Sequence, residues 1–138
     1  MVIGEYIELS MKGFSDIKDI TSKVEQIVSR SEVQNGTVAV FVIGSTASVS
    51  TMEYEPALVR DVQEKLEELI SSKIHSHHSE TWGDDNGFSH MRATLMGPGI
   101  TVPVVNGSMT LGTWQQIVII DHDNRARNRK VRVQVTGE

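Results

Sequence analysis

The sequence predicts an α+β fold in which helices cover one side of a largely antiparallel sheet. Segments with the period of a strand outnumber those with the period of a helix, and most of them lie near the C-terminus, joined by short turns. The order strand, helix, strand, helix and then several strands does not fit a long alternating parallel architecture. Because 138 residues is close to the commonest domain size, we expect a single domain over residues 1–138.

The N-terminal part predicts a strand followed by a helix. Residues 2–10 alternate well enough for a strand. Residues 15–30 are typical of an amphipathic helix with Ser15 as its N-cap, and Asn35-Gly36 predicts the turn that ends this unit. The buried face of this helix would contain Ile17, Ile20, Val24, Ile27 and Val28.

The central part predicts a buried strand and a second helix. Residues 37–43 form a continuous run rich in β-branched side chains, which predicts a strand buried on both faces. The small hydroxylated residues 44–48 suit a tight turn and also suit an oxygen-rich ligand. Pro56 predicts the first turn of the helix, since its fixed φ favours that position. The apolar face of this helix would contain Leu58, Val62, Leu66 and Leu69.

The C-terminal part predicts mainly strands. Residues 90–96 fit either a short helix or a strand. Residues 100–105 and 108–120 predict a β-hairpin, because Asn106-Gly107 between them is a strong turn signal. Residues 121–128 then predict a polar turn. A last half-buried strand follows, in which Val131, Val133 and Val135 alternate with polar or charged residues.

Composition excludes several classes of protein and site. The absence of cysteine excludes disulfides, thiolate nucleophiles and cysteine-type zinc sites. No apolar run is long enough to span a bilayer, and the N-terminus lacks the basic and apolar regions of a signal peptide. The net charge of −5 argues against general binding to nucleic acid. We expect a soluble, cytoplasmic protein with no nucleic-acid or membrane partner.

A basic cluster near the C-terminus has two interpretations. It fits a solvated turn followed by a charged edge strand. It also fits a patch that binds an anion or a phosphate. The cluster contains Arg125, Arg127, Arg129, Lys130 and Arg132.

The segment 75–92 carries the strongest chemical signal. It is expected to be a long loop, and it holds four of the five histidines, with three carboxylates between them. Neutral imidazole and carboxylate bind Zn²⁺, Mn²⁺ or similar ions, and they also perform acid–base chemistry near neutral pH. His78 and His90 are the first candidates for a site, with two unrelated surface histidines as the alternative.

The other histidines and Arg92 are more ambiguous. His75, His77 and His122 have the plainer interpretation of solvent-exposed side chains. Arg92 follows His90 by two positions, so in a strand both would point to the same face. Arg92 then fits either a bidentate grip on a phosphate or an ion pair with a neighbouring carboxylate.

Short motifs along the chain occur in the order and spacing of a known family. The most specific are Leu95-Met96-Gly97-Pro98, Thr101-Val102-Pro103-Val104, Asn106-Gly107 and Leu111-Gly112-Thr113-Trp114-Gln115-Gln116. Further matches are Thr46-Ala47-Ser48, Glu53, His78, Asp84, Asn86-Gly87, His90 and the ending Val135-Thr136-Gly137-Glu138. On these motifs, almost the entire chain resembles the YjbQ family.

The resemblance implies a fold, an assembly and a chemistry. The fold would be a sandwich of about two β-sheets with a helical layer on one side, assembled as a homotrimer around a three-fold axis. Members of the family are often described as secondary thiamine-phosphate synthases, which join a pyrimidine diphosphate to a thiazole phosphate. A divalent metal ion, Zn²⁺ or Mg²⁺ or Mn²⁺, is expected near the histidines.

The resemblance also implies roles for single residues. The metal ligands would be His78, His90 and Asp84, and the catalytic residues would be His90 and Glu53. The substrate contacts would be Arg92, Ser45, Thr46, Asn86 and Gln115. Turn formation accounts for the serine, threonine and Asx residues without a ligand, and proximity to a helix N-terminus accounts for Glu53.

Two positions depart from the family pattern. Gly44 and Phe88 stand where many relatives carry histidine, so a metal would have fewer protein ligands here. Three functions therefore fit the sequence. The first is an enzyme acting on a small anionic or phosphorylated metabolite, similar to a thiamine-phosphate synthase. The second is a metal-dependent hydrolase, and the third is a non-catalytic trimeric module that binds a ligand.

Overall fold

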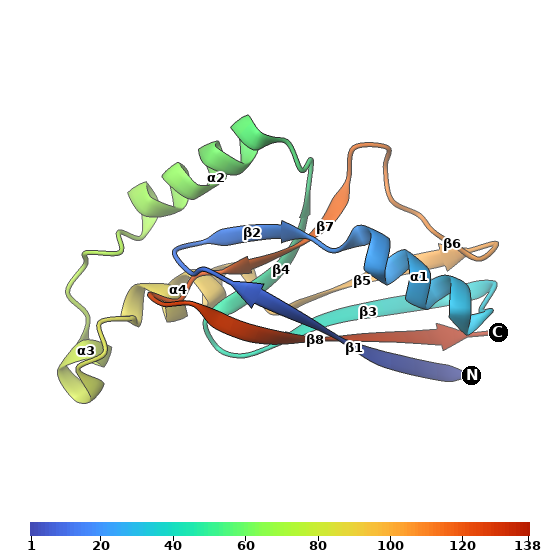
Figure 1. Cartoon of the computed structure of the whole chain (residues 1–138), viewed down its shortest axis with the longest axis horizontal. Helices are drawn as coiled ribbons and strands as arrows, with labels where there is room; N and C mark the ends of the chain where they lie inside the picture. The colour runs from blue at the N-terminus through green and yellow to red at the C-terminus, as the bar shows by residue number, and fades with distance from the viewer.

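Two antiparallel sheets pack face to face, and helix α2 lies outside the smaller one (Figure 1). The structure, a computed structural model, describes residues 1–138. The larger sheet has the strand order β1-β8-β3-β5-β6, and the smaller has the order β2-β7-β4. The strands are β1 (Val2–Met11), β2 (Asp16–Asp19), β3 (Asn35–Ile43), β4 (Ala47–Met52), β5 (Gly99–Val105), β6 (Ser108–Met109), β7 (Gln116–Asp121) and β8 (Arg127–Gly137). The helices are α1 (Thr21–Ser31), α2 (Pro56–Leu69), α3 (His77–Trp82) and α4 (Gly87–Met96).

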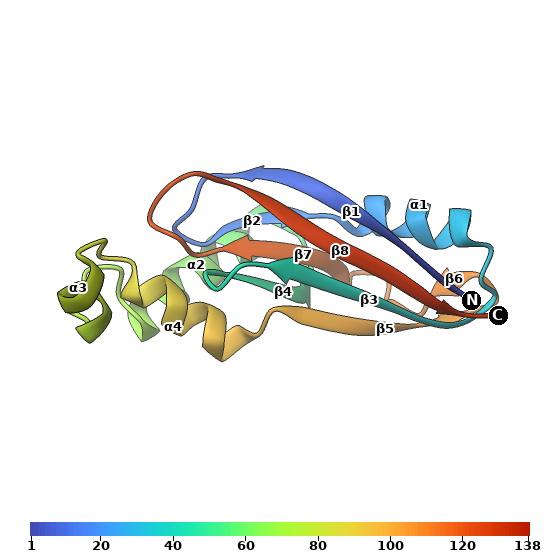
Figure 2. The same ribbon diagram turned by 90° about the horizontal axis from the view of Figure 1, so that it is seen from below.

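The main core lies between the two sheets, as the predicted sandwich requires. Alternate residues of β3 and β8 point inward and meet Val49, Ile117 and Ile119 of the smaller sheet. Complete burial of a valine or isoleucine side chain contributes about 1.5–3 kcal/mol. Helix α1 closes one end of this core, and α3 and α4 lie at the opposite end (Figure 2). The inward residues of β3, β8 and α1 are Val38, Val40, Val42, Val131, Val133, Val135, Val24, Ile27 and Val28.

A second, smaller cluster lies on the outer face of the smaller sheet. It contains Ile17, Val118 and Ile120, and Val59 and Val62 of α2 pack against it. Strand β7 is therefore covered on both faces. Pro56 begins α2 as predicted, where the Glu55 carboxylate accepts hydrogen bonds from two backbone N–H groups. On the predicted apolar face, Leu66 is buried but Leu69 is exposed.

The predicted helix over residues 15–30 is wrong in its first part. Residues 16–19 form β2, which pairs with β7, and the helix begins only at Thr21. Ile17 and Ile20 fit a helix by spacing, but they serve different clusters on the two sides of the smaller sheet. Ser15 is not an N-cap, because its hydroxyl contacts His122 instead.

Strand β3 also differs from its prediction. It is buried on one face only, since Val38, Val40 and Val42 are buried while the residues between them are exposed. Asn35-Gly36 is not a turn but begins the strand, and the chain reverses at Glu32, which has a left-handed backbone. Gly36 is needed in the strand because a Cβ there would collide with the backbone of β8.

The predicted C-terminal hairpin is correct at its turn, but its second strand is much shorter than predicted. Asn106-Gly107 connects β5 and β6 with positive φ at both residues, as a tight hairpin turn requires. The pairing stops after β6, however, and the chain crosses to the other sheet as β7. Strand β8 is not an edge strand, because it lies between β1 and β3. Residues 90–96, for which helix and strand both fitted, are helical.

The segment 75–92 is not one long loop. It contains the short helix α3 and the first turns of α4. Ser76 caps α3 by accepting a hydrogen bond from the Ser79 N–H group. No helix of the chain has the length and apolar character that crossing a bilayer requires.

Candidate functional site

The two histidines selected from the sequence meet where α3 approaches α4. The ring centroids of His78 and His90 are 4.5 Å apart, and the ring planes are inclined by 43°. His78 lies in the first turn of α3, and His90 lies in the first turn of α4. Gly87 permits this approach, because a Cβ at that position would collide with the Ser76 side chain. The predicted convergence of these two imidazoles is therefore observed in the fold.

Two buried polar atoms of this site, one on the pair itself and one next to it, have no hydrogen-bond partner. They are Nδ1 of His78 and Oδ1 of Asn86. The nearest acid to His78 Nδ1 is Asp84, whose Oδ1 lies 3.4 Å away. Asn86 uses its amide nitrogen to donate to Asp123 Oδ1 at 3.3 Å. Buried polar atoms are nearly always paired in folded proteins, so two unpaired atoms in one place mark a candidate site.

Local electrostatics keep the His90 ring neutral. Burial lowers the pKa of His90 below its ordinary 6.5, and the neighbouring His78 lowers it further, while Asp123 and Asp84 act in the opposite direction. A neutral imidazole has a free electron pair, which can accept a proton or bind a cation. His90 can therefore accept a proton from a substrate or bind a cation.

Behind the imidazoles lies a buried polar cluster that the sequence interpretation missed. The segment predicted as a polar turn begins with Asp121, His122 and Asp123, all completely buried. Arg129 donates from Nε and Nη2 to Asp121 at 2.6 and 2.9 Å, and Arg127 pairs with Asp123. A sequence signal did exist, because the run Ile117–Ile120 leads directly into these acids and two arginines follow at alternate positions.

His122 is a structural centre of this cluster rather than the exposed residue expected. Its Nδ1 lies 2.7 Å from Ser15 Oγ, and its Nε2 lies 2.9 Å from Ser48 Oγ. Burial lowers the pKa of His122 to about 3, with the positive charges of Arg92 and Arg129 acting in the same direction. Its ring is therefore neutral and connects the segment before β2, strand β4 and the segment after β7 by hydrogen bonds.

Arg92 forms an ion pair with a carboxylate, which was the second of the two roles expected for it. It lies on α4, so it does not share a face with His90 as a strand would have required. It is 1% exposed, and its Nη2 pairs with Glu67 Oε2 at 2.7 Å. Its remaining bonds go to the Ile70 carbonyl and Ser15 Oγ. The positive charge of Arg92 is thus already matched by a carboxylate inside the fold.

The other predicted contacts fall at two opposite ends of the smaller sheet. Thr46 lies at the imidazole end, where its hydroxyl donates to Asp123 Oδ2 at 3.1 Å and accepts from Arg129 at 2.6 Å. Glu53 and Gln115 adjoin the other end, since β4 and β7 pair with Met52 opposite Gln116 and Ala47 opposite Asp121. The fold of a single chain therefore does not bring Glu53 or Gln115 to the histidines.

The residues present fit a metal ion only in part. His78, His90 and Asp84 supply suitable nitrogen and oxygen donors, and Nδ1 of His78 lies 3.4 Å from Asp84 Oδ1 without a hydrogen bond. However, no three such side chains are arranged around one point in a way that would hold a metal. Phe88 is buried and stacks on Phe14 with ring centroids 5.9 Å apart, so it supplies no ligand atom.

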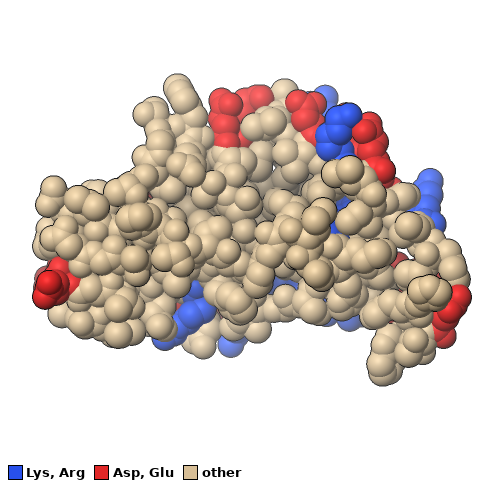
Figure 3. Space-filling view, turned by 180° about the vertical axis from the view of Figure 1, so that it is seen from behind, with Lys and Arg blue, Asp and Glu red and all other residues tan.

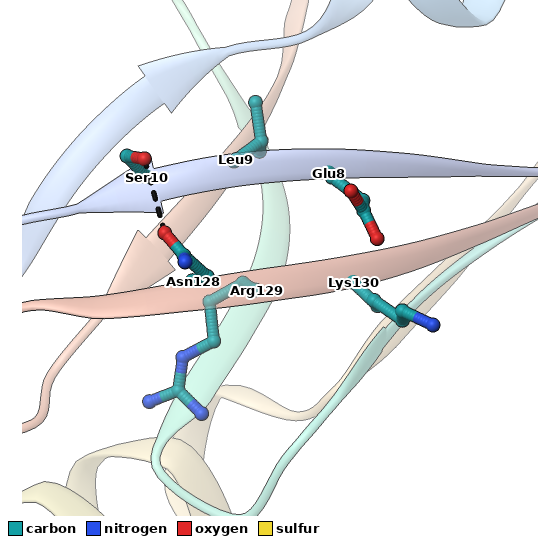
Figure 4. A pocket seen from close by; sticks show the side chains of 6 residues that line it. All are labelled: Glu8, Leu9, Ser10, Asn128, Arg129 and Lys130. Atoms are coloured by element: carbon teal, nitrogen blue, oxygen red, sulfur yellow. Dashed lines mark hydrogen bonds between the residues drawn. The ribbon is translucent and has the colours of Figure 1, made fainter.

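The main surface hollows do not include either imidazole. The first of them, of about 350 Å³, lies between β1 and β8 (Figure 4). Its exposed polar side chains include Ser10 and Asn128, which bond to each other at 3.0 Å, and nothing in it resembles a reactive cluster. A different hollow, of about 320 Å³, is lined by Gly44, Ser45, Ala93 and Thr94 among others. That hollow lies one helical turn along α4 from His90.

Comparison with known proteins identifies the family. A family model described as UPF0047 protein YjbQ-like matches residues 5–138. The chain belongs to the YjbQ-like UPF0047 family. A UPF0047 protein of Methanothermobacter thermautotrophicus is 40% identical over 123 residues, which are 89% of this chain and 84% of that protein. One of Archaeoglobus fulgidus is 35% identical over 130 residues, which are 93% of this chain and 98% of that protein.

Solved structures of the family have the same fold. A crystal structure of a YbjQ-like protein of unknown function from Sulfolobus solfataricus P2 gives a TM-score of 0.94 at 33% identity, covering 100% of this chain and 99% of that one. A hypothetical protein from Aeropyrum pernix K1 gives 0.86 at 33% identity, covering 97% and 99%. The YjbQ-like fold expected from the sequence is therefore confirmed, and function has to be argued from the site.

Proposed function

We propose that this YjbQ-like chain is an enzyme that acts on a small phosphorylated metabolite at the His78–His90 pair. The observation that carries the proposal is the convergence of two imidazoles, in which burial lowers the pKa of His90 and Nδ1 of His78 has no hydrogen-bond partner, beside the unpaired Oδ1 of Asn86. Perturbed titratable groups beside unsatisfied polar atoms are typical of functional sites. A purely structural pair would be expected to satisfy its own hydrogen bonds.

The chemistry follows from the charge of the substrate. A phosphate dianion placed beside the rings would raise the lowered pKa of His90, because a nearby negative charge favours the protonated imidazole. His90 and His78 can then neutralise a phosphate or diphosphate as it leaves. In the thiamine-phosphate version, the carbon–nitrogen bond to the thiazole forms while diphosphate departs from the pyrimidine. The proton on the imidazole stabilises the charge that develops on the departing oxygen.

A homotrimer is part of the proposal, and the surface supports it. The face seen from behind carries few charged side chains over its middle, while charges gather along α2 at its upper edge (Figure 3). The exposed residues of β3 and β5 include Phe41 and Val105, at 49% and 48% exposure. Exposed apolar area on a sheet face is typical of a protein–protein contact.

Metal-dependent hydrolysis is the second candidate. It is favoured by the unpaired Nδ1 of His78 at 3.4 Å from Asp84 Oδ1, because one imidazole and one carboxylate could share a divalent ion. A bound ion generates hydroxide at neutral pH. Titration of Zn²⁺ or Mn²⁺ into untagged protein, followed by the imidazole signals of the histidines in NMR spectra, separates this candidate from metal-free chemistry. The third candidate, a trimeric binding module, predicts saturable ligand binding without turnover.

His90→Ala is expected to lower turnover of the two thiamine-phosphate precursors by at least about 100-fold, the usual contribution of acid–base catalysis. The matched control is His75→Ala, since His75 is exposed and contacts only Glu80. Product formation is measured by chromatography, and the fold is checked by circular dichroism. Equal turnover in both variants, or no product from the unchanged protein under any condition, would overturn the enzyme proposal.

A further inference from the structure

The turn between β3 and β4 presents three unused backbone donors. The N–H groups of Gly44, Ser45 and Thr46 donate to no acceptor within the chain. Gly44 has φ +146°, a backbone conformation that side-chain-bearing residues rarely adopt. The turn lies beside α4 in both ribbon views (Figures 1 and 2). Successive free N–H groups in a glycine-containing turn form a concavity that attracts anions.

Arg129 points a free guanidinium nitrogen at the same turn. Its side chain is 7% exposed, and Nε and Nη2 are occupied by Asp121 and Thr46. Nη1 makes no hydrogen bond within the chain and lies 2.5 Å from the position that a Cβ of Gly44 would take. Figure 4 shows this guanidinium pointing away from Ser10 and Leu9, the residues of β1 beside it. A nearly buried cation thus faces a turn of unpaired donors.

The space in front of the turn leads toward the imidazoles. Ala93 and Thr94 of α4 line the hollow of about 320 Å³ together with Gly44 and Ser45. The Thr94 hydroxyl donates to the His90 carbonyl at 2.8 Å. Residues three and four positions apart lie on one side of a helix, so His90 and the hollow share a side of α4. The hollow therefore lies about one helical turn from His90, on the same side of α4.

The charges around the turn are balanced before a ligand binds. Asp121 and Asp123 are buried behind it and are matched by Arg129 and Arg127. Thr46 Oγ is already engaged with Asp123 and Arg129, so the donors left for a ligand are the three N–H groups, the Ser45 hydroxyl and Arg129 Nη1. The three N–H groups and Arg129 Nη1 can only donate, and the Ser45 hydroxyl can donate as well, so the set favours an anion.

We propose that the Gly44–Thr46 turn and Arg129 Nη1 form a subsite for a phosphoryl group of the ligand, with Arg129 as the residue that selects it. The inference rests on the proposed function, because the subsite would hold the part of the metabolite that does not react at His90. Gly44 is then required for a second reason besides its backbone. A side chain at this position would occupy the place of the phosphoryl group and displace Arg129.

The test uses ¹⁵N-labelled full-length protein titrated with inorganic phosphate and then pyrophosphate. The expected result is saturable shifts of the Gly44, Ser45 and Thr46 amides and of the Arg129 Nε–H signal. Ser45→Asp places a negative charge at the exposed turn and is expected to weaken binding at least about tenfold, whereas Thr113→Asp, on an exposed loop beyond β6, leaves it unchanged.

A second pair of variants distinguishes a side chain that occupies the phosphoryl position from strain in the backbone. Gly44→Ala and Gly97→Ala both strain a glycine with positive φ, but only Gly44 faces Arg129, since nothing lies within 4 Å of a Cβ at Gly97. Loss of phosphate binding in the first variant alone supports the subsite. The subsite is rejected if Ser45→Asp and Thr113→Asp weaken phosphate binding equally. It is also rejected if phosphate shifts only the signals of Lys130 and other exposed cations. Phosphate shifts at the turn without turnover would retain the subsite and reject the enzyme. Turnover without any shift of the turn amides would retain the enzyme and reject the subsite.

Discussion

The two ends of the sandwich are closed in different ways. At one end, α1 inserts Val24, Ile27 and Val28 between the sheets, and all three are almost completely buried. At the other end, the core stops at Asp121, His122 and Asp123, which are equally buried but polar. Burial of charge costs free energy unless each group is paired, and apolar residues of similar volume are often at least as stabilising. Stability alone therefore does not explain the polar end, and the imidazole pair lies beside it.

The largest effect on stability is expected from removing an ion pair at the polar end. Arg129→Ala leaves Asp121 buried without its partner, so we expect a loss of about 3–5 kcal/mol in the free energy of unfolding. Urea unfolding measures this change. An Arg129→Ala protein as stable as the unchanged chain would show that the polar end does not depend on its ion pairs, and the contrast between the two ends would be lost.

A second effect is the pH dependence that His122 confers. Its pKa is about 3 in the folded chain, below the 6.5 of the unfolded one, so the unfolded state binds more protons as the pH falls. The stabilising contribution is present above pH 6.5 and is lost below it, by at most about 1.4 kcal/mol per pH unit. We expect denaturation curves at pH 7.5 and 5.5 to differ accordingly.

His122→Gln provides the check on this assignment, with His77→Gln as its control, since the His77 side chain is fully exposed. The slope of stability against pH should flatten in the first variant and persist in the second. A slope that persists in both would assign the pH dependence to other groups and remove His122 from the account.

The smallest effect is expected at the apolar end. Ile27→Val removes one buried methylene group and should cost about 0.5–1.5 kcal/mol. It should leave phosphate binding and turnover unchanged, because the α1 end lies opposite the site. Thermal unfolding and the activity assay measure the two quantities. A loss of activity larger than the loss of folded protein would indicate that the two ends are coupled.

The contrast between the ends also explains what the sequence could predict. Local periodicity was sufficient for β1, for α2 beginning at Pro56, for the turn at Asn106-Gly107 and for the last strand. It failed at β2, because the spacing of Ile17 and Ile20 fits a helix, although Ile17 lies in the strand, Ile20 follows it and the two pack into different clusters. The distinction depends on pairing with β7, which is a contact distant in sequence.

The candidate site was predicted only where its residues cluster in sequence. His78 and His90 lie in one segment, so their convergence could be expected. The burial of His122 depends on Ser15, which is 107 positions away, and on Ser48, which is 74 positions away. A polar run read locally looks like a turn, and only the assembled fold shows that partners from other strands satisfy it.

The most direct test of the central claim is ¹⁵N NMR of the histidine rings during titration with pyrophosphate. The account predicts that the imidazole signals of His78 and His90 shift together and saturate, as protons are taken up beside the anion. The signals of His75 and His77 should not follow them. Rings of His78 and His90 that titrate with pH as independent, exposed histidines, and that ignore pyrophosphate, would contradict the assignment of this pair as the reactive site.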